Sequence, residues 1–254
     1  MCRWLRVGPV AAMLLWGHVV SGAAAQETSA DLFSSDWHNG IDTRLELQRA
    51  SPGAIRVVGL DRPDMRLALE FTIERDTDYR GVANGTPRAE VSFNRFLHFM
   101  RGRAYTIRWQ TLIPEDYRFD AQQPEVIAQI HQGPAAGYPP FALFIAGNGQ
   151  YEVHNRTNDR RDDVTRLFGA PLDDRGHVVD WLLRYIPDDA GQHALTELSE
   201  NGRVVFRLTG VPNAYRNDDG AYLKLGLYKA AWQHAPSDVD RRSLYYGRVS
   251  VREQ

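Results

Sequence analysis

Cysteine, lysine and clustered basic residues are scarce in this sequence of 254 residues. The only cysteine, Cys2, lies in a segment that we expect to be removed, so the mature chain would have neither a disulfide nor a catalytic thiol. There are 30 Lys and Arg against 32 Asp and Glu, a formal net charge of −2, and no basic run occurs. Because nucleic-acid binders carry a basic patch, we expect no nucleic-acid partner.

Residues 1–25 have the three parts of a signal peptide: two arginines near the start, an apolar stretch at residues 7–20, and small residues ending at Ala25. The apolar stretch, about 14 residues long, is shorter than the roughly 20 residues that a membrane span requires. We expect cleavage near Ala25, so that residues 26–254 are secreted or periplasmic and have no membrane span. We also expect this mature chain to be a monomer.

Helical periodicity is missing as well, and only short turns are expected, near Thr165–Phe168. The alternation of apolar and polar residues that is typical of half-buried antiparallel strands recurs instead. The predicted strands are residues 66–75, 88–93, 103–114, 126–132, 141–146, 150–155, 178–186, 195–199, 203–208, 222–229 and 244–252. Asn201-Gly202 is a hairpin signal between two of them. Without a repeat or a linker, residues 26–254 are predicted to form one all-β domain, an antiparallel jelly roll (a concanavalin-like sandwich).

Three of these strands carry unusual polar groups opposite their apolar face. Side chains at positions i and i+2 of a strand share one face. The side chains expected on the faces away from the core are Arg88, Glu90 and Ser92 in the first strand, Ile127, Gln129 and His131 in the second, and Tyr222, Lys224 and Tyr228 in the third. Val126 is expected on the core face of the second strand.

Each strand by itself also has an explanation without function. Arg88 and Glu90 could form an exposed ion pair, which contributes less than about 1 kcal/mol, and the amide, imidazole and phenol groups could simply face solvent. Their coincidence on the non-core faces of one sheet favours a site. In addition, the only two lysines, Lys224 and Lys229, lie in the same strand, while the other 28 basic residues are arginines.

In this order, the three strands resemble those of jelly-roll polysaccharide lyases. The Arg-x-Glu, Gln-Ile-His and Tyr-x-Lys-x-Gly-x-Tyr strands are similar to those of alginate lyases of polysaccharide lyase family 7, and still more to heparin-lyase and glucuronan-lyase domains. The resemblance extends from about Arg66 to Arg252. Ser92 stands where family 7 usually has a second arginine, which weakens the alginate assignment more than the lyase assignment.

The resemblance implies β-elimination at a uronic acid in a glucuronan-, alginate- or heparin-like polymer. It implies that Arg88 and Gln129 bind the substrate carboxylate, that His131 is a base or neutralises charge, and that Tyr228 is an acid or both acid and base. The other candidates for binding the substrate are Glu90, Lys224, Tyr222, Tyr138 and Trp232. Tyr138 and Trp232 could each stack on a sugar ring or cover an edge of the core, and the sequence favours neither role.

The chemistry explains why such groups are needed. Elimination removes the proton on C5, next to the carboxylate, and expels the oxygen on C4. The departing electrons enter a group that is already negative, so hydrogen-bond donors at the carboxylate stabilise the transition state, and losing one typically costs about 10²–10³ in rate. A histidine with an unperturbed pKa near 6.5 is a ready base.

Two rival functions remain open. A lectin-like module that binds acidic glycans without catalysis needs Arg88 and Lys224 but neither His131 nor Tyr228. A glycoside hydrolase needs two carboxylates about 5–10 Å apart, and no predicted strand supplies such a pair. No cofactor or catalytic metal is expected. The acidic residues at 158–163 and 213–220 could hold a structural Ca²⁺, but they lack the alternating oxygen spacing of a calcium loop, so we expect solvated loops.

Overall fold

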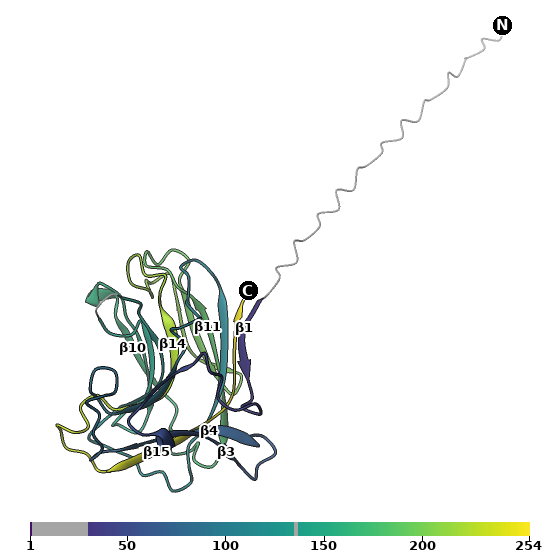
Figure 1. Ribbon diagram of the computed structural model, residues 1–254. Coiled ribbons are helices and arrows are strands. Elements are labelled where there is room, and N and C mark those ends of the chain that lie inside the picture. The colour runs from purple at the N-terminus through teal and green to yellow at the C-terminus, as the bar shows by residue number, and fades with distance from the viewer. Residues whose placement is uncertain (2–29, 135–136) are drawn as a thin grey trace.

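Two antiparallel β-sheets form the computed structural model, which describes residues 1, 30–134 and 137–254 (Figure 1). Apart from two single-turn 3₁₀ helices, Pro52–Ala54 and Arg160–Asp162, the elements of the described residues are all strands. The prediction of an all-β jelly roll is therefore confirmed. In this part of the chain, no helix has the length and apolar character needed to cross a membrane. The predicted signal peptide and its cleavage position lie outside the described residues.

The first sheet has eight strands. In the order of their pairing, they are β13 (Arg203–Thr209), β12 (Leu195–Glu200), β11 (Val178–Ile186), β6 (Tyr105–Leu112), β15 (Arg241–Glu253), β4 (Leu67–Glu74) and β3 (Ile55–Gly59), with β1 (Ala30–Ser35) also paired to β15. All of the pairings are antiparallel. The hairpin predicted at Asn201-Gly202 joins β12 to β13, and Asn201 and Gly202 both have a positive φ there.

The second sheet has seven strands and carries the three strands with unusual polar groups side by side. In the order of their pairing, they are β10 (Val164–Phe168), β9 (Tyr151–Asn155), β8 (Phe141–Ile145), β7 (Glu125–His131), β14 (Tyr222–Tyr228), β5 (Arg88–Ser92) and β2 (Glu46–Arg49). The register places Lys224 of β14 between Gln129 of β7 and Ser92 of β5. Residues that are distant in sequence therefore share one row across the sheet.

The core lies between the two sheets and is built from the alternate residues of their strands. Large aromatic side chains from both sheets are fully buried in it, including Trp109 and Trp181 of the first and Tyr151 of the second. Trp109 and Trp181 stack with their ring centroids 6.1 Å apart, and the Tyr151 ring meets Trp181 edge-on at 5.2 Å. Burial of this size holds the domain without disulfides. It leaves the opposite face of the second sheet free for a site.

Two predictions about local structure are wrong. Thr165–Phe168, expected to be a turn, lies in β10, the strand at one edge of the second sheet. In β7, a bulge between Val126 and Ala128 adds one residue to the pairing with β8. As a result Ile127, expected to face away from the core, is buried in it, whereas Val126 faces the opposite side.

Candidate active site

A cleft of about 750 Å³ lies on the face of the second sheet that points away from the first sheet. Its orientation follows from the strand pattern, because Leu223, Leu225 and Leu227 of β14 are buried in the core while the intervening side chains face the cleft. The polar side chains that line it from the strands are Gln48 on β2, Arg88 on β5, Gln129 and His131 on β7, Tyr222, Lys224 and Tyr228 on β14, and His154 on β9.

A buried carboxylate, that of Glu90, organises the floor of the cleft. The side chain is 2% exposed, and both of its oxygens are used. Oε1 accepts a hydrogen bond from Nε2 of Gln129 at 2.5 Å, while Oε2 accepts from Nζ of Lys224 at 2.6 Å and from Nη1 of Arg88 at 3.1 Å. Burial alone raises the pKa of Glu90, but Lys224 and Arg88 outweigh it and hold the pKa below its usual value. Glu90 is therefore ionised and fixes three cleft residues at once.

The cluster around Glu90 has an excess of positive charge. Arg88 and Lys224 carry two cations against the one carboxylate in contact with them, and the Lys224 side chain is 2% exposed. Burial lowers the pKa of Lys224, which Glu90 and, less strongly, Glu46 oppose. A buried cation that is not fully neutralised attracts an anion. The floor of the cleft is thus suited to a negatively charged ligand.

Arg88 is held in place on three sides. Its Nη2 donates to Oδ1 of Asn84 at 2.5 Å and to Oγ1 of Thr86 at 2.6 Å, and its Nη1 donates to Glu90. The guanidinium lies over the ring of Tyr228, 4.2 Å from the ring centroid. Nη1 keeps one N–H beyond its bond to Glu90, so Arg88 can still donate to a ligand.

His131 lies two residues beyond Gln129 on the same face of β7, opposite Tyr222 in the pairing of β7 with β14. The two rings stack, with their centroids 5.2 Å apart. Nδ1 of His131 lies 2.8 Å from the backbone oxygen of Gln132. Because a carbonyl oxygen can only accept, Nδ1 carries the proton, and Nε2 of the neutral ring has a free lone pair. Burial lowers the pKa of His131, which favours this neutral form.

Gly226 allows β14 to lie close enough to β5 for this arrangement. Its φ is +138°, and a Cβ atom built there would lie 2.2 Å from the backbone oxygen of Ala89 and 2.7 Å from Cα of Glu90. Any other residue would push the two strands apart. The glycine in the Tyr-x-Lys-x-Gly-x-Tyr strand is thus required by the position of Glu90.

The family follows from a match that covers most of the chain. Residues 32–250 match the family model described as polysaccharide lyase. This chain belongs to that family. As a polysaccharide lyase, it acts on a polysaccharide. The predictions of the family and of the enzyme class are confirmed.

Solved structures agree with this assignment in their fold. The lyase superposes on an endo-β-1,4-glucuronan lyase from the fungus Trichoderma reesei with a TM-score of 0.70, at 21% identity over 87% of this chain and 95% of that one. A family 7 alginate lyase in complex with product gives 0.56, at 15% identity over 83% and 94%. A marine alginate lyase of the same family from Zobellia galactanivorans gives 0.50, at 15% identity over 74% and 78%. No curated protein matches the sequence.

The structure brings most of the residues selected from the sequence into the one cleft. Arg88, Gln129, His131, Tyr222, Lys224, Tyr228 and Tyr138 all line it. Tyr138 is 60% exposed at the rim, so its ring is available to a ligand. Lys224 is present as a buried charge under the cleft, and it contacts Glu90 across the strands.

Two of the predicted binding residues require correction. Glu90 was expected to bind the substrate, but both of its oxygens are occupied by neighbouring side chains and it does not line the cleft. Trp232 was a candidate for stacking on a sugar, but its ring is fully buried and its Nε1 donates to Oγ of Ser237 at 2.8 Å. Glu90 is a positioning residue, and Trp232 belongs to the core.

Other residues of the cleft did not stand out from the sequence. His154 and Arg156 line its far side, together with Phe144 of β8. The alternation in β9, where Val153 and Asn155 are buried, places His154 and Arg156 on the opposite face and could have revealed them. Asn84 lies in a turn before β5 and carries no periodic signal.

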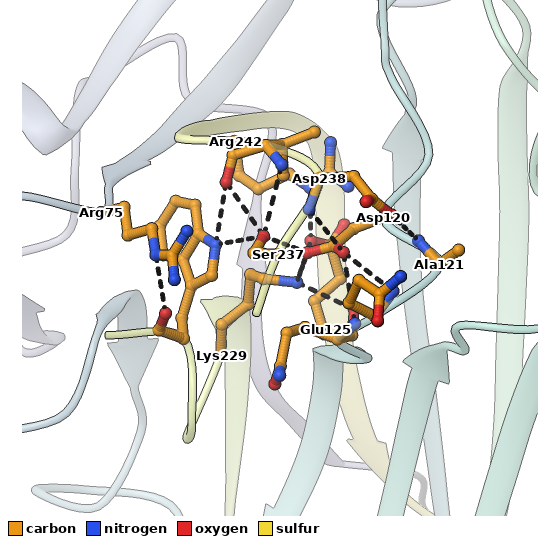
Figure 2. A network of polar contacts seen from close by, with 12 residues as sticks. Arg75, Asp120, Ala121, Glu125, Lys229, Ser237, Asp238 and Arg242 are labelled. Carbon is orange, nitrogen blue, oxygen red and sulfur yellow. Dashed lines mark hydrogen bonds and ion pairs between the residues drawn. The ribbon is translucent and has the colours of Figure 1, made fainter. Parts of the chain in front are cut away.

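A second buried cluster surrounds Lys229, just after β14. Figure 2 shows Lys229 directed at Asp120 and Glu125, with Arg242 and Ser237 close by. Nζ of Lys229 lies 3.0 Å from Oδ2 of Asp120 and 3.7 Å from Oε2 of Glu125, and Nε of Arg242 lies 2.8 Å from Oε2 of Glu125. Nζ also donates to the backbone oxygen of Gln123 at 2.9 Å. Because Gln123 lines the cleft, this cluster supports one of its walls.

Proposed function

We propose that this lyase cleaves a uronic-acid polysaccharide by β-elimination in the cleft, leaving an unsaturated uronate at the new end. The observation that carries the proposal is the convergence of Arg88, Gln129, His131 and Tyr228 on one cleft whose floor has an excess of positive charge. A carboxylate is the substrate group that such a floor favours.

The substrate carboxylate binds to Arg88 and Gln129 in this proposal. Nη1 of Arg88 and Nε2 of Gln129 each donate one hydrogen bond to Glu90 and retain one N–H. Glu90 thereby sets the direction of both remaining donors before the substrate arrives. Donors fixed in advance stabilise the charge that develops on the carboxylate as the C5 proton leaves.

His131 acts as the base and Tyr228 as the acid. With its proton held on Nδ1 by the Gln132 carbonyl, neutral His131 has no donor left for a carboxylate, but Nε2 can accept the C5 proton. Tyr228 then donates its phenolic proton to the departing O4. The C5–H and C4–O bonds break and the C4–C5 double bond forms, so no external oxidant or cofactor is needed.

Glucuronan is the first polymer to test, since the glucuronan lyase gives a TM-score of 0.70 and Ser92 replaces the second arginine of family 7. In glucuronate H5 and O4 lie on the same side of the ring, whereas in guluronate they lie on opposite sides. A polyguluronate therefore requires both His131 and Tyr228, while on glucuronan Tyr228 could transfer both protons. Comparing His131→Asn on the two polymers separates these mechanisms, because residual activity confined to glucuronan would assign both transfers to Tyr228.

The decisive experiment follows the ultraviolet absorbance of the new double bond with glucuronan, alginate, heparin, hyaluronan and pectate. We expect absorbance with at least one polymer. Binding without absorbance would instead favour a lectin-like module, and new reducing ends without absorbance would favour a hydrolase.

Tyr228→Phe is the sharpest variant for this mechanism. It removes only the phenolic oxygen and keeps the ring under Arg88, so we expect a loss of about 10²–10⁴ in kcat, the usual contribution of a positioned proton donor. Circular dichroism and thermal unfolding should match the wild type. Turnover near that of the wild type would exclude Tyr228 from the reaction.

We also propose that residues 26–254 are exported after cleavage near Ala25 and act as a cofactor-free monomer. N-terminal sequencing of the exported protein tests the cleavage position, and light scattering tests the oligomeric state. Activity that persists in a chelator would support cofactor independence, while its loss on chelation and return with Ca²⁺ would contradict it.

A further inference from the structure

The cleft contains a second arginine, Arg156, that the elimination step does not use. It follows β9, and its backbone N–H donates to the oxygen of Pro140 at 2.8 Å. Phe141 pairs with Ile130 of β7, so Pro140 lies next to His131 in the adjoining row. Arg156 is therefore two strands away from His131, roughly 10 Å at the usual strand spacing. A polymer that lies across the strands can therefore reach Arg156 with a sugar beyond the one that is cleaved.

The charge of Arg156 is not neutralised by an ion pair. Among residues 30–134 and 137–254, no carboxylate oxygen lies within 4 Å of its guanidinium, and no acceptor forms a hydrogen bond with that group. Asp163 is the carboxylate that most favours its charged form, without pairing with it. Arg88, in contrast, is bonded to Glu90. With respect to the described residues, the half-buried guanidinium of Arg156 therefore keeps its N–H donors available to a ligand.

An aromatic ring lies beside this cation. The guanidinium of Arg156 lies over the ring of Tyr138, 4.9 Å from the ring centroid. The hydroxyl of Tyr215 donates to the backbone oxygen of Tyr138 at 2.7 Å, which fixes the position of Tyr138 at the rim. Five N–H donors beside an exposed aromatic ring suit a sugar that carries a carboxylate, because the ring packs on the apolar face of the sugar and the fork binds the carboxylate.

We propose that Arg156 and Tyr138 form a second uronate subsite in the cleft, in which Arg156 binds the carboxylate of another sugar of the chain that is cleaved. The inference rests on the proposed function, since it assumes a uronate polymer lying across the strands. It predicts that the polymer crosses the sheet from β5 toward β9. It also predicts that a chain too short to reach Arg156 binds more weakly.

The test is Arg156→Gln, which removes the charge and keeps the length of the side chain. Arg108→Gln is the matched control, because Arg108 is an exposed arginine of β6 in the first sheet, away from the cleft. Arg156→Lys keeps the charge but loses the two-pronged geometry of the fork. KM and kcat are measured on the uronate polymer that the wild type cleaves best. Binding is also measured on a preparation of it whose carboxyl groups have been reduced, which cannot undergo the elimination.

For Arg156→Gln we expect KM to rise about tenfold, the effect of losing one charge-assisted hydrogen bond, while kcat stays within about twofold because the interaction is equal in ground and transition states. Arg156→Lys should be intermediate, and Arg108→Gln should resemble the wild type. The binding difference between wild type and Arg156→Gln should disappear on the carboxyl-reduced polymer, as judged by affinity electrophoresis. An unchanged KM in a folded Arg156→Gln, with an active wild type, overturns the subsite and leaves the proposed function intact.

If the wild type cleaves none of the polymers, the proposed function fails, and the subsite is then judged by binding alone. Affinity electrophoresis in gels containing the same polymers compares wild type with Arg156→Gln. Weaker retardation of the variant would still support an anionic subsite, whereas equal retardation would overturn it.

Discussion

Two buried charge clusters follow one another along β14, and each contains one of the only two lysines of the chain. The cluster under the cleft has two cations, Arg88 and Lys224, against the single carboxylate of Glu90. The cluster after the strand has two cations, Lys229 and Arg242, against the carboxylates of Asp120 and Glu125. The first therefore has a net positive charge, and the second is balanced.

The difference in balance separates the roles of the two clusters. In the balanced cluster, Ser237 and the hydroxyl of Tyr117 donate to Asp120 and Glu125, at 2.6 Å each, and so satisfy the carboxylates further. Nη2 of Arg242 is buried without a hydrogen-bond partner among the described residues, but the cluster has no excess charge that would attract an ion. Such a network holds loops together. In the cleft cluster, Arg88 and Gln129 keep donors that no side chain of the cluster satisfies. These free donors and the positive charge make the cleft cluster suitable for binding an anion.

The largest effect that follows from this comparison is expected for Glu90→Gln. The substitution keeps the shape of the side chain but leaves Arg88 and Lys224 without their shared carboxylate, so the donors to the substrate lose their direction. We expect kcat/KM to fall by at least about 10²-fold, as when a fixed donor is lost from an anion site, measured as the rate of double-bond formation.

A control is needed because unpaired buried cations can also destabilise the fold. Glu90→Gln combined with Lys224→Met removes one cation along with the carboxylate and should recover thermal stability without recovering activity. Recovery of activity in this double variant would show that Glu90 serves the fold and not the site.

The reverse result is expected for Glu125→Gln in the balanced cluster. It leaves Lys229 and Arg242 with one carboxylate between them, and breaking a buried pair in this way typically costs about 3–5 kcal/mol in the free energy of unfolding. Chemical denaturation measures this loss. The folded fraction should keep a kcat within a few-fold of the wild type, because Glu125 does not line the cleft. A loss of kcat as large as that for Glu90→Gln would erase the distinction between the clusters.

The sequence predicted the strands of the site well, because β5, β7 and β14 each combine a buried face with a polar one. It missed β1, β2 and β3, which are short and lack a clear alternation, and it misassigned β10, an edge strand of largely exposed residues. The bulge that exchanges Val126 and Ile127 depends on pairing with β8 and leaves no trace in a single strand. Local periodicity indicates which face a residue takes only where the register is regular.

The contacts of the charged residues were harder to predict than their faces. Glu90 and Lys224 were correctly placed away from the core, but strand alternation does not distinguish an exposed face from the floor of a cleft under loops. Trp232 lies in a loop after β14, where no periodicity indicates that its ring is buried. Partners such as Asn84 for Arg88 arise from the turn that precedes β5.

The smallest effect concerns the dependence of activity on pH. Burial lowers the pKa of His131 below its ordinary value near 6.5, and among the charged side chains Lys224 and Arg88 lower it further while Glu90 raises it. A base is active when deprotonated, so kcat/KM should rise with pH and reach half of its plateau below pH 6.5. Lys224→Met removes one of the cations and should move this acid limb toward higher pH. Lys229→Met, in the balanced cluster, should leave the acid limb of the kcat/KM profile unchanged. Equal shifts in both variants would mean that the two clusters affect the pKa of His131 alike.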